Sequence, residues 1–232
     1  PFRGWGHSGN LCFASTSLSL VFHALQFVSW VATEPRERLF EDAQMAFESL
    51  WDGDARHTEI ASLDIMAPDT SWKTGKFLEQ QAGKHKCANE FLCTLFDDLR
   101  SEGGDGFMQL WRCLSQRRVG LAAVEDLFWL LYPRGSNVTT PVAMEQLVEE
   151  SGTHQEDDPS QAPPMRYQQL GDVVFFWVAR HPRSHTETAK WRQPVQLSER
   201  LELPMFGRQN RVATFRLVGF VEHHGLTFSG GH

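Results

Sequence analysis

Two glycine-bearing segments, one near each end of the chain, hold the residue types needed for nucleophilic catalysis. In the first, Cys12 follows the turn-forming pair Gly9-Asn10, and the apolar periodicity that begins there predicts that this cysteine opens a helix. Unpaired NH groups and the dipole at a helix N-terminus stabilise a thiolate, and the same NH groups can point at the oxygen of a carbonyl under attack. A free cysteine is also often a small buried hydrophobe, so this segment alone leaves both roles open.

The second segment is rich in histidine and glycine. It reads His223-His224-Gly225 and, after four residues, Gly230-Gly231-His232. An imidazole is the group that most often takes the proton of a catalytic thiol, and glycines let another backbone pass close by. The histidines could instead bind a metal, but no third ligand at helical or Cys-x-x-Cys spacing accompanies them. We therefore expect neither a metal nor another cofactor.

Composition limits the class of protein. The chain has 232 residues, 41% of them hydrophobic and 22% charged, which is enough to bury a large core. The four cysteines never form a Cys-x-x-Cys pair, so we expect neither a disulfide scaffold nor a zinc ribbon, and a reducing, intracellular location. The net charge of -7 argues against nucleic acid as a partner and is compatible with a basic polypeptide. Residues 11–32 lack charge but hold several Ser, Thr, Gln and His residues, which favours a buried helix over a membrane span.

The elements that must position these groups change in type along the chain. Helices are predicted over 12–31, 35–50 and 88–99, with Asp97 and Asp98 on the outer face of the third and a Gly-rich break at 101–106. The run 119–132 fits either a strand or a helix, and a short helix is predicted from Thr140-Pro141 to Glu150.

The acidic, proline-containing segment 152–164 is predicted to be an exposed loop, and strands follow over 172–179, 195–203 and 213–223. The first of these strands contains Phe175-Phe176-Trp177, which we expect in a buried central strand. Helices followed by strands predict an α+β domain whose two parts meet at a cleft.

Together the two terminal segments resemble a known family. Gly9-Asn10-Leu11-Cys12-Phe13 resembles the cysteine box of the ubiquitin-specific proteases, and the histidine segment resembles their histidine box. Weaker similarities lie between them, at Ala88-Asn89-Glu90-Phe91-Leu92, at Thr140 to Leu147 and at Val173 to Arg180.

The resemblance implies a papain-like cysteine protease fold with a helical thumb, reduced fingers and a β-rich palm. It implies a single catalytic domain over residues 1–232, with the thumb at about 1–115, the fingers and acidic loop at 116–168 and the palm at 169–232. The implied activity is a thiol-dependent deubiquitinase that cleaves after the C-terminal glycine of ubiquitin, with ubiquitin or ubiquitinated proteins as partners.

The resemblance also assigns roles to individual residues. Cys12 falls on the nucleophile and His232 on the general base, while His7 and the NH of Cys12 would form the oxyanion hole. Substrate-binding positions are implied at Asn10, Glu90, His223, Gly230 and Gly231.

Four departures from the family pattern leave alternatives open. His7 stands where the family usually has Asn or Asp, and Lys86-Cys87-Ala88 replaces Gln-Asp-Ala. The paired cysteines of the fingers are missing, and the third residue of the triad is expected beyond His232, in a longer chain. The alternatives are a ubiquitin-binding pseudo-protease and a protease for another modifier such as SUMO.

Overall fold

The computed structural model describes residues 12–33, 72–80, 87–111, 113–116, 124–126, 128–133, 139–151, 166–180, 191–205, 212–222 and 224. The chain divides into two compact units. The first contains the helices up to Leu110 together with the segment that begins at Val218, and the second runs from Trp111 to Leu217. The predicted helix at 35–50 and the predicted loop at 152–164 lie outside the described residues.

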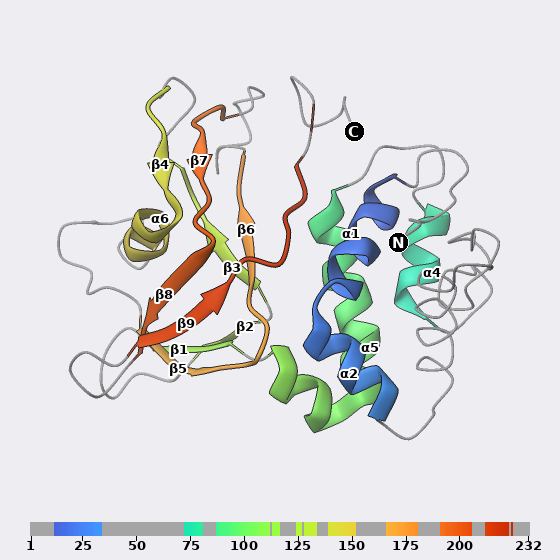
Figure 1. The fold of residues 1–232 in the computed structure, drawn as a ribbon. Coiled ribbons are helices and arrows are strands. Elements are labelled where there is room, and N and C mark those ends of the chain that lie inside the picture. Colours follow the sequence, from blue (N-terminus) through green and yellow to red (C-terminus); the bar gives the residue numbers. More distant parts are fainter. Residues whose placement is uncertain are drawn as a thin grey trace, which may run out of the picture. The chain divides into compact units, whose positions relative to one another are not determined.

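Four helices build the described part of the first unit (Figure 1): α1 (Cys12–Phe22), α2 (Leu25–Thr33), α4 (Lys73–Gln80) and α5 (Ala88–Trp111), the last residue of which belongs to the second unit. The prediction of one helix over 12–31 is wrong, because the chain turns at His23-Ala24. The NH of Ala24 donates to the carbonyl of Val21 at 3.1 Å, which closes a tighter, three-residue turn. The His23 ring contacts the carbonyl of Ser19 at 2.6 Å and so competes for a helical acceptor.

Helix α5 is longer than the predicted 88–99, although the Gly-rich run does interrupt it. Gly104 has φ 50° and ψ −132°, a conformation outside the helical region that side chains other than glycine rarely adopt. The helix resumes after this kink because its next turn buries Phe107, Met108 and Leu110.

A series of ring contacts fills the core of the first unit. Phe22, Phe27, Trp30, Phe107 and Phe96 contact one another in that order, with ring centroids 5.6 to 5.9 Å apart. Gly103 lies against this series: a Cβ atom there would come within 2.7 and 2.8 Å of the Trp30 ring and 2.9 Å of the Phe107 Cβ. The missing side chain therefore lets α2 and α5 pack closely.

Replacing Gly103 with alanine should lower the free energy of unfolding by about 1–2 kcal/mol, because overpacking against the Trp30 ring outweighs the better helix propensity of alanine. Urea unfolding followed by tryptophan fluorescence measures the change. The exposed Gln109→Ala on the same helix is the control and should change stability by less than about 0.5 kcal/mol. Equal values for the two variants would contradict the close approach.

The described part of the second unit is mostly β-structure (Figure 1). Its elements are β1 (Cys113–Gln116), β2 (Val124–Asp126), β3 (Phe128–Leu131), β4 (Val142–Ala143), α6 (Met144–Ser151), β5 (Arg166–Leu170), β6 (Phe175–Val178), β7 (Val195–Gln196), β8 (Arg200–Pro204) and β9 (Val212–Arg216). The sheet orders are β2-β1-β5, β3-β6, β4-β7 and β8-β9. The pairs β3-β6 and β4-β7 are parallel, and the others are antiparallel.

The structure resolves the ambiguous run 119–132, in its described part, as β2 and β3. Helix α6 begins at Met144 and not at Pro141, because Val142 pairs with Val195 and donates its NH to the Pro194 carbonyl at 2.9 Å. Extended backbone that pairs with another strand cannot also form the first turn of a helix. The predicted start of the helix at Thr140-Pro141 is therefore wrong.

The later strands are shorter than predicted, and β5 was not predicted at all. The expected strand 195–203 is two strands with a bend at Glu199, and the expected strand 213–223 ends at Arg216. Leu217, the residue after β9, is 41% exposed. The aromatic strand β6 is half-buried and, among the described strands, pairs with β3 alone, so its prediction as a buried central strand is wrong.

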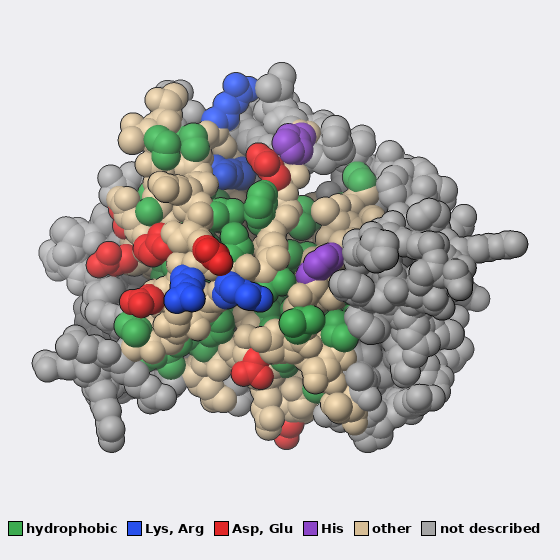
Figure 2. Space-filling view, viewed as in Figure 1, with side chains coloured by type: hydrophobic (Ala, Val, Ile, Leu, Met, Phe, Trp, Pro, Cys, Tyr) green, Lys and Arg blue, Asp and Glu red, His purple; other side chains and the backbone are tan. Residues whose placement is uncertain are grey.

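Helix α6 and several strands share one core. Its buried members are Trp129, Leu131, Val142, Met144, Leu147, Val148, Leu201 and Leu203. Leu201 and Leu203 of β8 are buried here and Phe215 of β9 is half-buried, while Arg200, Glu202 and Arg216 on the other face are exposed. Figure 2 shows the resulting mixture of basic and acidic side chains over these two strands. This alternation is the period-two pattern expected of a ribbon with one buried face.

Candidate functional site

Cys12 is the first residue of α1 and is half-buried, so the prediction that it opens a helix is confirmed. Its carbonyl oxygen accepts a hydrogen bond from the Thr16 hydroxyl, one turn further along the helix. The first backbone NH groups of a helix have no partner within the helix. Such a position suits a cysteine nucleophile.

The residue after the cysteine attaches α1 to two other helices. The Phe13 ring is 7% exposed and makes edge contacts with Phe77 of α4 and Phe91 of α5, at centroid distances of 6.4 and 5.7 Å. One turn later, the buried Ser17 hydroxyl donates to the carbonyl of Ala88 at 3.4 Å. The start of α1 is therefore fixed against both α4 and the start of α5.

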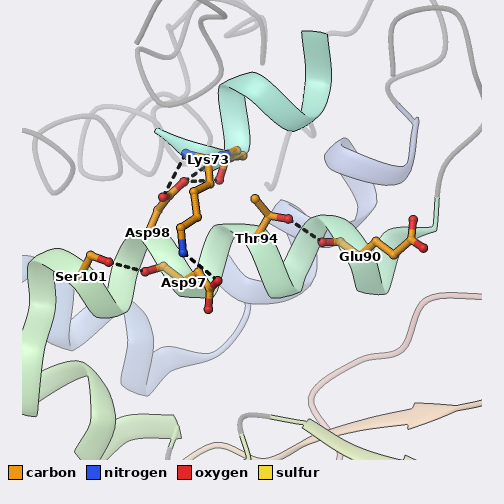
Figure 3. A network of polar contacts seen from close by, with 7 residues as sticks. Lys73, Glu90, Thr94, Asp97, Asp98 and Ser101 are labelled. Carbon is orange, nitrogen blue, oxygen red and sulfur yellow. Dashed lines mark hydrogen bonds and ion pairs between the residues drawn. The ribbon is translucent and has the colours of Figure 1, made fainter. Parts of the chain in front are cut away.

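Glu90 lies in the first turn of α5 with an exposed side chain (Figure 3). Its carbonyl oxygen accepts a hydrogen bond from the Thr94 hydroxyl at 2.9 Å, and its carboxylate extends away from the helix. An exposed carboxylate near the N-terminus of a helix is favoured by the dipole and is free to meet a basic ligand. Its predicted role in substrate binding stays a prediction.

Two further cysteines stand at the start of α5, and the environment makes both poor nucleophiles. Partial burial raises the pKa of the Cys87 thiol, against hydrogen bonds from the Glu90 and Asn89 backbone that lower it. Burial also raises the pKa of the Cys93 thiol from 9.0 to about 11, and the charge of Asp97 acts in the same direction. The Asn89 amide donates to the Cys93 sulfur at 3.6 Å. Both residues are therefore neutral thiols near pH 7.

We expect Cys93 to react with iodoacetamide about 100-fold more slowly at pH near 8 than a cysteine of ordinary pKa, because its thiolate fraction is lower by that factor. Mass spectrometry of the alkylated peptides gives the rate at each cysteine. Urea-unfolded protein is the control, since unfolding restores the ordinary pKa. Equal rates at Cys93 in the folded and unfolded chains would contradict the raised pKa.

Asp98 is buried, contrary to prediction. It was predicted on the outer face of α5 but is 4% exposed. Its carboxylate accepts hydrogen bonds from the backbone NH of Lys73 at 3.1 Å, from the backbone NH of Thr74 at 2.8 Å and from the Thr74 hydroxyl at 2.6 Å. The neighbouring Asp97 is exposed, as predicted, and pairs with the Lys73 ammonium at 3.0 Å (Figure 3).

This arrangement has a local cause in the sequence of α4. The residue before Lys73 is Trp72, which cannot cap a helix, so the first NH groups of α4 need an acceptor from elsewhere. Asp98 supplies it from α5 and acts as the N-cap of a different helix. The missing capping residue is a signal in the sequence that the start of α4 needs an acceptor from elsewhere, but it does not indicate which residue supplies it.

Several residues assigned by the resemblance lie outside the described residues: His7, Asn10, His223, Gly230, Gly231 and His232. The described structure therefore places Cys12 and Glu90 on neighbouring, connected helices and leaves the other roles as predictions. Within the described ranges, no three His, Cys, Asp or Glu residues gather closely enough to bind a metal ion. Of the described helices, none has the length and apolar character that crossing a bilayer requires.

Comparison with known proteins shows what the fold is similar to. Neither family models nor curated protein sequences match the chain. Among solved structures, it is similar to a chain of the SAGA Ubp8/Sgf11/Sus1/Sgf73 DUB module bound to ubiquitin aldehyde, with a TM-score of 0.73 and 14% identity. That match covers 99% of this chain and 60% of the other chain.

A second structure of this module, with a Ubp8 variant and bound to monoubiquitin, gives a TM-score of 0.67 at 12% identity, covering 99% of this chain and 59% of that one. The chain thus spans about 60% of the length of the chains it matches. At these identities the similarity shows the fold alone. It supports a mixed α and β fold related to that of a deubiquitinase module.

Proposed function

We propose that this protein is a thiol-dependent deubiquitinase that hydrolyses the isopeptide or peptide bond after the C-terminal glycine of ubiquitin. The observation that carries the proposal is the position of Cys12, half-buried at the first residue of α1, in a chain whose fold is similar to DUB modules bound to ubiquitin. The papain-like assignment, with thumb, fingers and palm, is part of the same proposal.

In the proposed reaction, His232 takes the proton of the Cys12 thiol, and the sulfur attacks the carbonyl carbon of the last ubiquitin residue. The NH of Cys12 and the His7 side chain donate hydrogen bonds to the oxygen that becomes negative. The C–N bond then breaks, the leaving amine receives the proton from His232, and a thioester remains on Cys12. Water, activated by the same imidazole, hydrolyses the thioester and regenerates the thiol.

The proposed substrate contacts follow the same segments. Asn10, Glu90 and His223 would contact the ubiquitin tail, and Gly230-Gly231 would leave a channel narrow enough for its terminal glycines. Among these contacts, the one proposed for Glu90 has the most direct support, because the Glu90 side chain is exposed at the start of the helix that contacts α1. The proposed setting is intracellular, where a catalytic thiol stays reduced.

One observation favours weaker binding of ubiquitin or binding of a different modifier. Where the family has an acidic residue, this chain has Cys87, and its raised pKa keeps it neutral. A neutral thiol cannot replace a carboxylate in binding a basic tail. The alternatives are therefore a ubiquitin-binding pseudo-protease and a protease for another modifier such as SUMO.

The test is reaction of the full-length protein with ubiquitin whose C-terminus carries a thiol-reactive group, beside Cys12→Ala and the matched variant Cys87→Ala. We expect a covalent adduct with the natural sequence and with Cys87→Ala, and none with Cys12→Ala. Ubiquitin binding without an adduct would favour the pseudo-protease. If the protein neither binds ubiquitin nor forms the ubiquitin adduct, but forms an adduct with the corresponding SUMO probe, then SUMO is its modifier and the proposal is overturned.

A further inference from the structure

We propose that Phe77 of α4 is a positioning residue for Cys12, acting through the ring of Phe13. This inference rests on the proposed function, in which Cys12 is the nucleophile. It assigns to α4, a helix that contributes none of the proposed site residues, the task of fixing the first turn of α1.

The contacts that carry the inference meet at Phe13. Its ring lies next in sequence to the thiol and is held by two other rings, Phe77 and Phe91, with interplanar angles of 82° and 74°. Two edge contacts of this kind fix both the position and the tilt of the central ring. Because Phe13 and Cys12 share a peptide bond in a helical turn, a shift of the ring moves the backbone that carries the sulfur.

One of the two supports is firmly set by its own helix. Phe91 is fully buried at the end of the first turn of the long helix α5, and the hydrogen bond between Ser17 and Ala88 holds α1 to this same turn. Rotation of the first turn of α1 away from α5 is therefore opposed on this side.

The other support depends on a short helix and so needs an anchor. Helix α4 has eight residues, too few to be stable alone, and Phe77 stands one turn after Thr74. The buried carboxylate of Asp98 binds the backbone NH groups of Lys73 and Thr74 and the Thr74 hydroxyl (Figure 3). This fixes the first turn of α4, and with it the position of Phe77, against the same helix that carries Phe91.

The chemical consequence concerns the direction of the sulfur. A thiol nucleophile must meet its base and the carbonyl carbon together, and a displacement of about 1 Å can cost roughly 100-fold in rate. Loss of the Phe77 ring should therefore reduce the rate of the chemical step while substrate binding is kept, because Phe77 itself is assigned no contact with substrate.

The kinetic experiment compares three variants in the full-length protein, with a fluorogenic amide of ubiquitin as substrate. We expect Phe77→Leu to lower kcat about 10-fold with KM unchanged within about 2-fold. Phe77→Tyr keeps the ring, and its hydroxyl can reach solvent because Phe77 is half-buried, so it should retain kcat within about 2-fold. The control Phe22→Leu removes a similar edge contact, with Phe27, at the far end of α1 and should leave kcat unchanged.

A double-mutant cycle tests the route through Phe13. If Phe77 acts through that ring, Phe13→Leu combined with Phe77→Leu should have the same kcat as Phe13→Leu alone. If the double variant instead loses kcat by the product of the two single losses, the route through Phe13 is overturned. If Phe77→Leu and Phe22→Leu lower kcat equally, Phe77 has only a general role in stability and the positioning role is overturned. Circular dichroism at the assay temperature confirms that each variant is folded.

A measurement without ubiquitin separates this inference from the proposed function. The rate of Cys12 alkylation by iodoacetamide, obtained from the mass of its peptide, should change at least about 3-fold in Phe77→Leu and stay unchanged in Phe22→Leu, because a displaced helix start alters the exposure and direction of the sulfur. If the natural sequence hydrolyses no ubiquitin but alkylation follows this pattern, the function fails and the positioning role stands. An unchanged Cys12 rate in Phe77→Leu overturns the positioning role.

Discussion

Replacement of Cys12 with alanine should lower the hydrolysis of ubiquitin conjugates by roughly 10⁴-fold or more, because removal of a nucleophile leaves only binding and oxyanion stabilisation. The expected loss is in kcat, while ubiquitin binding persists, since the side chain at the first residue of α1 is needed for bond formation and not for the fold. Initial rates with a fluorogenic ubiquitin amide and a ubiquitin binding isotherm measure the two effects separately.

Cys93→Ala is the matched control. Cys93 belongs to the same unit and is an exposed residue, but the pKa of its thiol is raised to about 11. Its rate should stay within about 2-fold of the natural sequence, since a surface substitution away from the site usually has little effect. A Cys12→Ala protein that keeps more than a few per cent of the rate would show that another residue is the nucleophile.

Asp98→Ala should lower the free energy of unfolding by about 2–4 kcal/mol, the largest change in stability that we expect from a single polar residue of the described structure. The substitution leaves the backbone NH groups of Lys73 and Thr74, and the Thr74 hydroxyl, without their buried acceptor. Urea unfolding followed by far-ultraviolet circular dichroism gives the free energy, and hydrogen exchange should show α4 losing protection first.

The next residue back along the same helix provides the control. The carboxylate of Asp97 lies on the surface, and both partners of its ion pair with Lys73 are exposed. Asp97→Ala should therefore lower the free energy of unfolding by less than about 1 kcal/mol. Asp98→Asn, which keeps one oxygen acceptor but loses the charge, should fall between the two. Equal destabilisation by Asp97→Ala and Asp98→Ala would contradict the capping role.

The local pattern of the sequence predicted the elements whose residues carry their own signal. The apolar period that begins at Cys12 predicted the start of α1, and the Gly-rich run predicted the interruption that the structure places at Gly104. Helix α5 and strands β8 and β9 overlap the predicted regions, although each extends beyond the predicted range at one end. The ends of the elements were not predicted correctly, because they depend on which neighbour offers a hydrogen bond. Val142, for example, pairs with Val195, and this pairing prevents a helix from starting at Pro141.

The candidate site divides in the same way. The sequence by itself determined that Cys12 stands at a helix N-terminus, that Asp97 faces solvent and that the chain combines helices with strands, because each of these follows from residues close together in the chain. Only the tertiary structure decided that Asp98 is buried as the cap of α4 and that Phe13 lies between Phe77 and Phe91. The partners in these contacts come from different helices, and a periodic pattern shows which face of a helix is buried but not which group it meets there.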